Sequence, residues 1–220
     1  TVKNIEIPTK PSDIATNEDS RREWRRAAAA VHFENDRQQS KRLQVAKVLY
    51  LSEKFSNDLI YYPHQTDKRA RGYPLPSFLQ PQGPDWSRSA LQFGRGHRMD
   101  ENAVSWLAVH TANGWGMDKH PFSERIQWVE DNTDMIRAVA KDPLGCMEWV
   151  KADAPWKFLA ACMDWDGMHT EGKQYKSHIP VCLDATTQGL QIYAMLLRDE
   201  DAAYETNVLP RERPGDVYQS

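Results

Sequence analysis

The sequence lacks a long apolar run and has few cysteines. No stretch approaches the ~18–20 apolar residues that a helix needs to cross a bilayer, and the first residues show no signal-peptide pattern. The three cysteines, Cys146, Cys162 and Cys182, are an odd number without the spacing of metal ligands. These absences argue against secretion and membrane insertion, and they indicate a reduced, cytosolic protein.

The 220 residues nevertheless contain enough apolar material for a folded core. Hydrophobic residues make up 40% of the chain and charged residues 27%, which excludes a largely disordered protein. The net charge of −3 conceals an asymmetry, because residues 1–100 carry a basic excess of five and residues 101–220 an acidic excess of eight. This division suits a protein that holds a polyanion on one side and a cation on the other, although solvated surfaces often give similar imbalances.

Helical patterns dominate the chain. Asn17 or Ser20 can cap a helix that begins near Arg21, and a second helical stretch follows over about 38–55. Further helices are expected at 101–113, 122–129, 131–140, 143–151, 155–163 and 188–198. The β-prone segments are 59–62 and 179–183, and the region 63–83 should be irregular with a short hairpin. The predicted fold class is α+β, mainly helical.

Asp184 is the first candidate for a catalytic or metal-binding residue. It follows a short apolar strand candidate and precedes a tight turn and a helix, and α/β proteins bind ligands and metals at such strand ends. A helix N-cap explains the position equally well. One carboxylate cannot hold two divalent ions; Asp164, Asp166 and Glu171 are possible partners, but they lie in a polar stretch that reads as a solvated loop.

A second candidate is the basic segment 67–73. It places three cations within four residues, next to Gly72 and Tyr73. Guanidinium groups bind phosphate in a bidentate manner, and aromatic faces stack on bases. An exposed basic turn is the simpler interpretation of this segment taken alone. His110 is interpreted as a core or surface residue, and the tryptophans as packing residues.

The segment around Asp184 resembles motif A of the phage-type single-subunit DNA-directed RNA polymerases. That motif joins an aspartate, a small turn, Gly and Gln to a helix ending Met-Leu-Arg-Asp, and residues 183–199 read LDATTQGLQIYAMLLRD. Residues 67–73 are similar to the family's Asp-x-x-Gly-Arg element. Further matches lie in the same order at 24–31, 81–83, 112–126, 207–210 and 216–218. The resemblance therefore covers almost the whole chain.

The resemblance implies a right-hand polymerase fold, with the end of the thumb at 1–57, most of the palm at 58–212 and the start of the fingers at 213–220. It implies template-directed nucleotidyl transfer by a two-metal mechanism with Mg²⁺. Asp184 would bind both ions, and the backbone carbonyl of Ala185 would help to hold one. One ion would lower the pKa of the RNA 3′-hydroxyl, and the other would neutralise charge on the triphosphate.

The resemblance also implies contacts with the DNA template, the nascent RNA and the nucleoside triphosphate. The residues implied near the template and the RNA–DNA hybrid are Arg69, Arg71 and Tyr73. Those implied in phosphate contacts independent of sequence are Arg25, Arg26, Lys41 and Arg42. Lys119 and Tyr218 would lie near the triphosphate.

Three positions depart from the family pattern. The glycine of the Asp-x-x-Gly-Arg element is Ala70, which costs about 1 kcal/mol if the position needs a positive φ, unless Gly72 absorbs the bend. Ala185 replaces the usual glycine after the aspartate, and Ile192 replaces a common histidine. None of these changes removes a group that the chemistry requires.

Two elements that follow motif A in the family do not occur before Ser220. They are a fingers helix with Lys and Tyr, and a His-Asp-Ser element with the second metal-binding aspartate. We therefore expect one subunit of a split enzyme, or a truncated product, that is inactive without a complementary chain and acts in the cytoplasm of an infected bacterial host. The alternative is an inactive polymerase fragment that only binds nucleic acid or a partner chain. A family-A DNA polymerase is less favoured, because 188–190 lacks the bulky acidic residue of its motif A.

Overall fold

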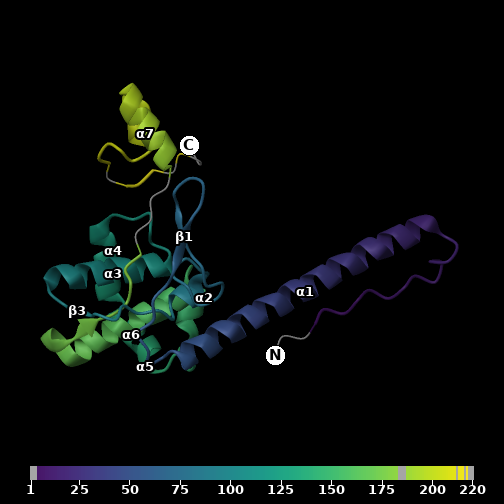
Figure 1. The fold of residues 1–220 in the computed structure, drawn as a ribbon, viewed down its shortest axis with the longest axis horizontal. Coiled ribbons are helices and arrows are strands. Elements are labelled where there is room, and N and C mark those ends of the chain that lie inside the picture. Colours follow the sequence, from purple (N-terminus) through teal and green to yellow (C-terminus); the bar gives the residue numbers. More distant parts are fainter. Residues whose placement is uncertain (1–3, 183–186, 212, 216, 218–220) are drawn as a thin grey trace.

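The computed structural model describes residues 4–182, 187–211, 213–215 and 217, and in these ranges the chain is mainly helical (Figure 1), as predicted. The α-helices are α1 Glu18–Lys54, α2 Asp85–Arg88, α3 Glu101–Trp115, α4 Phe122–Asp131, α5 Thr133–Lys141, α6 Pro155–Glu171, α7 Gln188–Leu197 and α8 Glu200–Glu205. The short 3₁₀ helices are η1 Met147–Lys151 and η2 Gly172–Gln174. Two antiparallel strand pairs join β1 His64–Thr66 to β2 Gly72–Pro74 and β3 His97–Arg98 to β4 Lys176–Ser177. In these ranges no helix is long and apolar enough to span a membrane.

Helix α1 is a single rod of 37 residues that projects from the helical body (Figure 1). The Asn17 side chain caps it by accepting from the amides of Asp19 and Ser20, as the sequence predicts. The prediction of two helices with a break near residue 38 is wrong, because the segment 18–54 contains neither Gly nor Pro to interrupt the backbone hydrogen bonds. Only Ala28 and Val48 are buried along this helix, so most of its surface faces solvent.

The polar lead-in of the chain runs back along α1 (Figure 1). The Asn35 side chain accepts from the backbone N–H of Ile5 and donates to its carbonyl, at 2.8 and 2.9 Å. Trp24 Nε1 donates to the Pro8 carbonyl at 2.8 Å. The lead-in therefore covers one side of α1 and leaves the other side open.

The core lies among α3, α4, α5 and α6. Phe158 of α6 is fully buried, with ring centroids 5.2 Å from Trp115 and 6.5 Å from Trp128. Gly114 of α3 permits this packing, because a Cβ at that position would lie 3.2 Å from Cα of Phe158. The interpretation of these tryptophans as packing residues is confirmed. The cysteines are free, and Cys162 is buried in the same core.

Several predicted elements differ in the structure. The β-prone segment 59–62 forms no strand and leaves Tyr61 81% exposed. The helix expected at 143–151 is reduced to η1, since 143–145 form a turn that the Asp142 side chain closes by accepting from Gly145 N. Residues 179–182 form no strand, because the pairing partner of β3 lies earlier, at β4. Helix α6 is longer than expected and continues to Glu171.

The β1–β2 hairpin is organised by the side chain of Asp67. Its Oδ1 accepts from the amides of Arg69 and Arg71 at 2.8 and 3.0 Å. Backbone bonds from Ala70 N to the Asp67 carbonyl and from Asp67 N to the Arg71 carbonyl complete the loop. The Arg71 amide is the main cause that lowers the pKa of Asp67, so this carboxylate is ionised at neutral pH. The short hairpin predicted within 63–83 is confirmed.

The backbone of this hairpin turns at Ala70. Its φ is 58°, in the left-handed region that glycine adopts more readily than any residue with a Cβ. The positive φ considered for this position is therefore present. The expectation that Gly72 could absorb the bend is wrong, because Gly72 lies in β2 opposite Thr66 and its φ is not positive.

Replacing Ala70 by Gly is predicted to stabilise the protein, because it relieves about 1 kcal/mol of left-handed strain. Thermal unfolding should show a Tm higher by about 2–4 °C. The matched control is Ala138→Gly, at an exposed position of α5, which should lower Tm because Gly weakens a helix interior by about 1 kcal/mol. A Tm of Ala70→Gly at or below that of the parent chain would contradict the strain.

Candidate nucleic-acid interface

The loop of the β1–β2 hairpin presents cations to solvent. The Arg69 side chain is 61% exposed, with Nε 3.4 Å from Asp67 Oδ2, and Arg71 is exposed as well. Tyr73 lies in β2 opposite Gln65 and is 38% exposed. Asp67 Oδ1 accepts from two backbone amides of the loop and so fixes its conformation. The same carboxylate compensates part of the positive charge of the loop arginines. This arrangement can bind phosphate through guanidinium groups and offers an aromatic ring nearby.

The four cations predicted on α1 are all exposed, but they do not share one face of the helix. At about 100° per residue, Arg26 and Lys41 lie about 60° apart around the axis, whereas Arg25 and Lys41 lie about 160° apart. Arg42 lies about 100° from Lys41, toward the side of Trp24 and the lead-in. A single straight duplex therefore cannot contact all four.

Four cations of α1 do share one face, within a sector of about 100° around the helix axis, and we call them the basic strip. They are Arg22, Arg26, Arg37 and Lys41. Arg37 is partly compensated by Glu34, since Nη2 donates to Oε1 at 2.9 Å. The sequence prediction did not include Arg22 and Arg37. The signal that could have found them is the spacing of four residues between 22 and 26 and between 37 and 41.

Lys119 lies in the loop 116–121 between α3 and α4. The Lys119 side chain is 59% exposed, and its Nζ is 3.9 Å from Asp118 Oδ2. Gly116 begins the loop with a φ of 121°, and His120 N donates to the Met117 carbonyl in a turn. The loop therefore holds an accessible ammonium group near the end of a buried helix.

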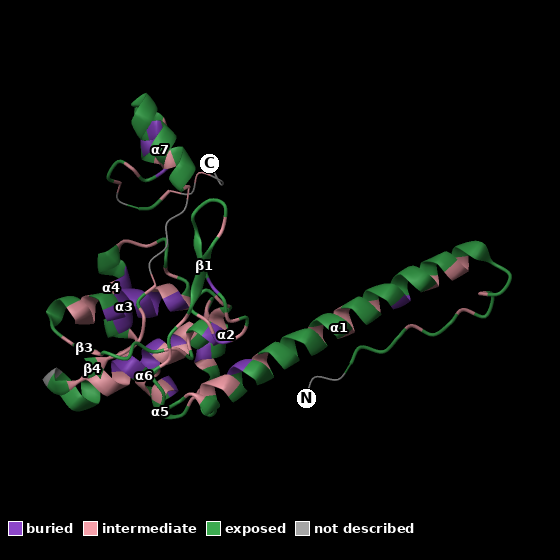
Figure 2. Cartoon of the chain, viewed as in Figure 1, coloured by how far each residue is buried: buried purple, intermediate pink, exposed green. Residues whose placement is uncertain are grey.

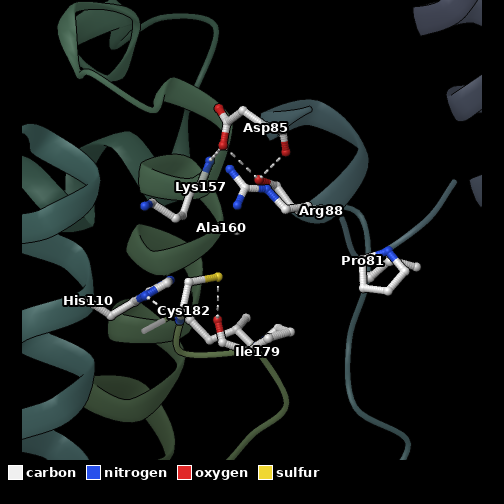
Figure 3. A pocket seen from close by; sticks show the side chains of 11 residues that line it. Pro81, Asp85, Arg88, His110, Lys157, Ala160, Ile179 and Cys182 are labelled. Atoms are coloured by element: carbon white, nitrogen blue, oxygen red, sulfur yellow. Dashed lines mark hydrogen bonds between the residues drawn. The ribbon is translucent and has the colours of Figure 1, made fainter. Parts of the chain in front are cut away.

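A pocket lies beside the chain that leads toward residue 184 (Figure 3). His110 of α3 is buried there, and its Nδ1 accepts from the amide of Cys182 at 3.4 Å. Burial, with the charge of Lys157 as a smaller cause, lowers the pKa of His110 to about 4, so the ring is neutral at pH 7. His110 was interpreted as a core or surface residue, and the structure places it in the core, where it also accepts from the segment after β4.

Asp85 also lies at this pocket and serves the fold. It accepts from the amides of Trp156 and Lys157 at 2.8 and 3.2 Å, and so satisfies the free amides of the first turn of α6. The carboxylate is ordered by a helix N-terminus, where negative charge is favourable. Its hydrogen bonds therefore give Asp85 a structural role.

Asp184, Ala185 and Tyr218 lie outside the described residues. The acids considered as partners of Asp184 do not form a solvated loop, since all three are on α6. Asp164 is buried and accepts from the Tyr175 hydroxyl at 2.6 Å, and Asp166 pairs with Arg137 at 2.7 Å. Within the described ranges no group of three or more His, Cys, Asp or Glu side chains could hold a metal ion. The described residues therefore do not supply a magnesium site by themselves.

Comparison with known proteins gives one consistent family. A family model described as DNA-dependent RNA polymerase matches residues 97–220. The DNA-directed RNA polymerase of Enterobacteria phage T3 is 37% identical over 97% of this chain and 24% of its own length. The T7 RNA polymerase of Escherichia phage T7 is 36% identical over 99% of this chain and 25% of its own length. The mitochondrial DNA-directed RNA polymerase of Neurospora crassa is 33% identical over 96% of this chain and 15% of its own length.

The chain thus spans about a quarter of the length of its phage relatives. The family model alone covers more than half of the chain, and the match to the phage enzymes runs through the hairpin, the Lys119 loop and residue 184. The chain therefore belongs to the phage-type single-subunit DNA-directed RNA polymerases.

Proposed function

We propose that this chain forms the end of the thumb (1–57), most of the palm (58–212) and the start of the fingers (213–220) of a right-hand polymerase that synthesises RNA on a DNA template. The observation that carries the proposal is the hairpin. Residue 70 has a left-handed φ where the family's Asp-x-x-Gly-Arg element has glycine, in a chain similar to the phage enzymes over nearly its whole length. A left-handed residue at the position where the family's element has glycine supports the assignment of this hairpin to that element.

Asp184 is the proposed metal ligand, together with the backbone carbonyl of Ala185. Both groups are hard oxygen donors, which Mg²⁺ prefers. When bound, two such ions supply the activation of the RNA 3′-hydroxyl and the neutralisation of the triphosphate. Because one carboxylate cannot serve two ions, the second acid has to come from another part of the polymerase.

The hairpin and the basic strip on α1 are proposed to hold the RNA–DNA hybrid. Arg69 and Arg71 would contact phosphates, and Tyr73 would pack near the template. Arg26 and Lys41 of the basic strip would add contacts that do not depend on sequence. Arg25 and Arg42 remain proposed contacts, but each would need a different segment of nucleic acid.

Lys119 and Tyr218 are proposed near the nucleoside triphosphate. The exposed ammonium group of Lys119 suits a phosphate as a compact point charge. Template, nascent RNA and triphosphates are therefore the proposed partners, in the cytoplasm of an infected bacterium.

Another part of a polymerase, on the same or a separate chain, is proposed to cover α7. This helix is apolar on nearly all sides, and Figure 2 shows it largely exposed. Its apolar residues that are at least 46% exposed are Leu190, Ile192, Tyr193, Met195, Leu196 and Leu197. A helix that is hydrophobic all round is normally buried, and contiguous apolar surface marks a protein contact.

Binding to an RNA–DNA hybrid should depend on the hairpin. The double variant Arg69→Ala/Arg71→Ala is predicted to weaken hybrid binding about tenfold at moderate salt and to reduce the slope of log K against log salt by about 1–2, because two phosphate contacts are lost. Fluorescence anisotropy over a salt series measures both. The matched control is Arg95→Ala/Arg98→Ala, which removes the same charge from exposed positions elsewhere. Equal weakening by the two double variants would contradict the proposed contact.

The chain alone is predicted not to extend an RNA primer. The measurement is extension of a primed DNA template with Mg²⁺ and nucleoside triphosphates, with and without a second chain that carries the remaining polymerase segments. Extension is expected only with the second chain, since one carboxylate provides too few ligands for two ions. Extension by the isolated chain would refute the division of the site.

Asp184→Asn should abolish extension in that complete system while leaving hybrid binding largely intact. The change keeps the size of the side chain and removes the negative charge that holds the ions. Asp201→Asn, at an exposed position of α8, is the control and should extend normally. If Asp184→Asn retained near-normal extension, Asp184 would not be the ligand. Absence of extension in the complete parent system would instead favour an inactive binding module.

A further inference from the structure

Arg125 is a buried cation near the start of α4. The residue is 7% exposed, and the described part of the chain offers it no ion pair with a carboxylate. A buried charge is costly unless hydrogen bonds replace its hydration. Burial lowers the pKa of Arg125, but a guanidinium group keeps its proton in proteins. The structure must therefore satisfy this charge with neutral acceptors.

Three short hydrogen bonds engage the three nitrogens of this guanidinium group. Nε donates to the His120 carbonyl at 2.7 Å, and Nη2 donates to the Asp118 carbonyl at 2.6 Å. Nη1 donates to Asn113 Oδ1 at 2.8 Å, on the last turn of α3. The two carbonyl acceptors are those immediately before and after Lys119 in the chain. One guanidinium group thus joins both sides of the Lys119 loop to the helix that precedes it.

Arg125 cannot itself reach a ligand. Its three nitrogen positions are all engaged inside the protein, and its guanidinium carbon lies 5.0 Å from the centre of the Phe122 ring. Lys119 on the same loop is exposed, and its ion-pair contact among the described residues is a 3.9 Å approach to Asp118. The buried cation therefore shapes the loop, and the exposed cation is the one available for binding.

We propose that Arg125 is a positioning residue, which fixes the Lys119 loop so that the Lys119 ammonium group is held for the nucleoside triphosphate. The inference rests on the proposed function for the role of Lys119, whereas the contacts of Arg125 stand independently of it. Arginine is required because its planar fork presents donors in fixed directions, which a lysine cannot reproduce. Without the guanidinium group, the Asp118 and His120 carbonyls lose these hydrogen-bond donors.

The contacts can be tested in the chain as it exists, without activity. The Arg125 Nε–H signal in ¹⁵N-resolved NMR, identified by its loss in Arg125→Lys, should exchange with solvent at least about tenfold more slowly than that of the exposed Arg25. In Arg125→Lys, amide hydrogen exchange of 117–120 should accelerate, while exchange in α1, which projects from the helical body, should be unchanged. Equal exchange of the two Nε–H groups in the parent chain would overturn the proposal, even if every variant failed to fold.

The effect on activity is measured as KM and kcat for the nucleoside triphosphate, by primer extension with the complete polymerase. Arg125→Lys is expected to raise KM for the nucleoside triphosphate about tenfold with a smaller change in kcat. The matched control is Arg137→Lys, which alters a half-buried arginine of α5 that pairs with Asp166 of α6 and should leave KM unchanged. Lys119→Ala should raise KM as well, and Lys119→Ala/Arg125→Lys should be no worse than Lys119→Ala alone.

The outcomes separate the two proposals. If Lys119→Ala leaves KM unchanged while the NMR contacts hold, the proposed role of Lys119 fails and the positioning of the loop stands. If the double variant raises KM by the product of the two single-variant factors, Arg125 acts independently of Lys119 and the inference is overturned. An equal rise of KM in Arg137→Lys would also overturn it, because the effect would then be general.

Discussion

Helix α3 packs closely against α6 in the centre of the helical body. Gly114 lets the two backbones approach closely, and Phe158 then fills the space between the two helices beside Trp115. The Lys119 loop leaves the end of α3, and His110 on the same helix accepts from the segment after β4. A single rigid helix therefore fixes the starting points of two proposed contacts, the triphosphate loop and the approach to residue 184.

The cations of the chain divide into two groups with different roles. Arg125 and Arg137 are buried or half-buried and bind carbonyls, an amide or a carboxylate within the fold. The cations at the hairpin loop and on the basic strip are largely exposed, and their side chains extend into solvent. The first group sets the shape of the site, and the second group is available for phosphate. Net charge alone does not distinguish the two.

Local patterns predicted much of this fold, and contacts between distant residues account for the rest. The Asn17 cap, the helices α3 to α5 and α7, and the hairpin are confirmed because each depends on nearby residues. The predicted strand at 179–183 was wrong over 179–182, since strand pairing depends on a partner far along the chain.

Side-chain contacts between separate elements were not predicted. Asp164 was interpreted as solvated, because no neighbouring residue indicates its hydrogen bond to Tyr175. The role of Arg125 was missed for the same reason. The resemblance raised a positive φ at Ala70 only as a condition, and the structure shows that the condition is met. Asp184 lies outside the described residues and stays a prediction.

A cross-link from the RNA 3′ end tests directly whether the hairpin and the segment around residue 184 lie at the site of nucleotide addition. A primed RNA–DNA hybrid that carries 4-thiouridine at the RNA 3′ terminus is irradiated with the complete polymerase, and the adducts on this chain are mapped by mass spectrometry. Adducts are expected within the hairpin, 67–73, and within 183–190. Adducts confined to the lead-in before α1, or none on this chain while the rest of the polymerase is labelled, would contradict this placement.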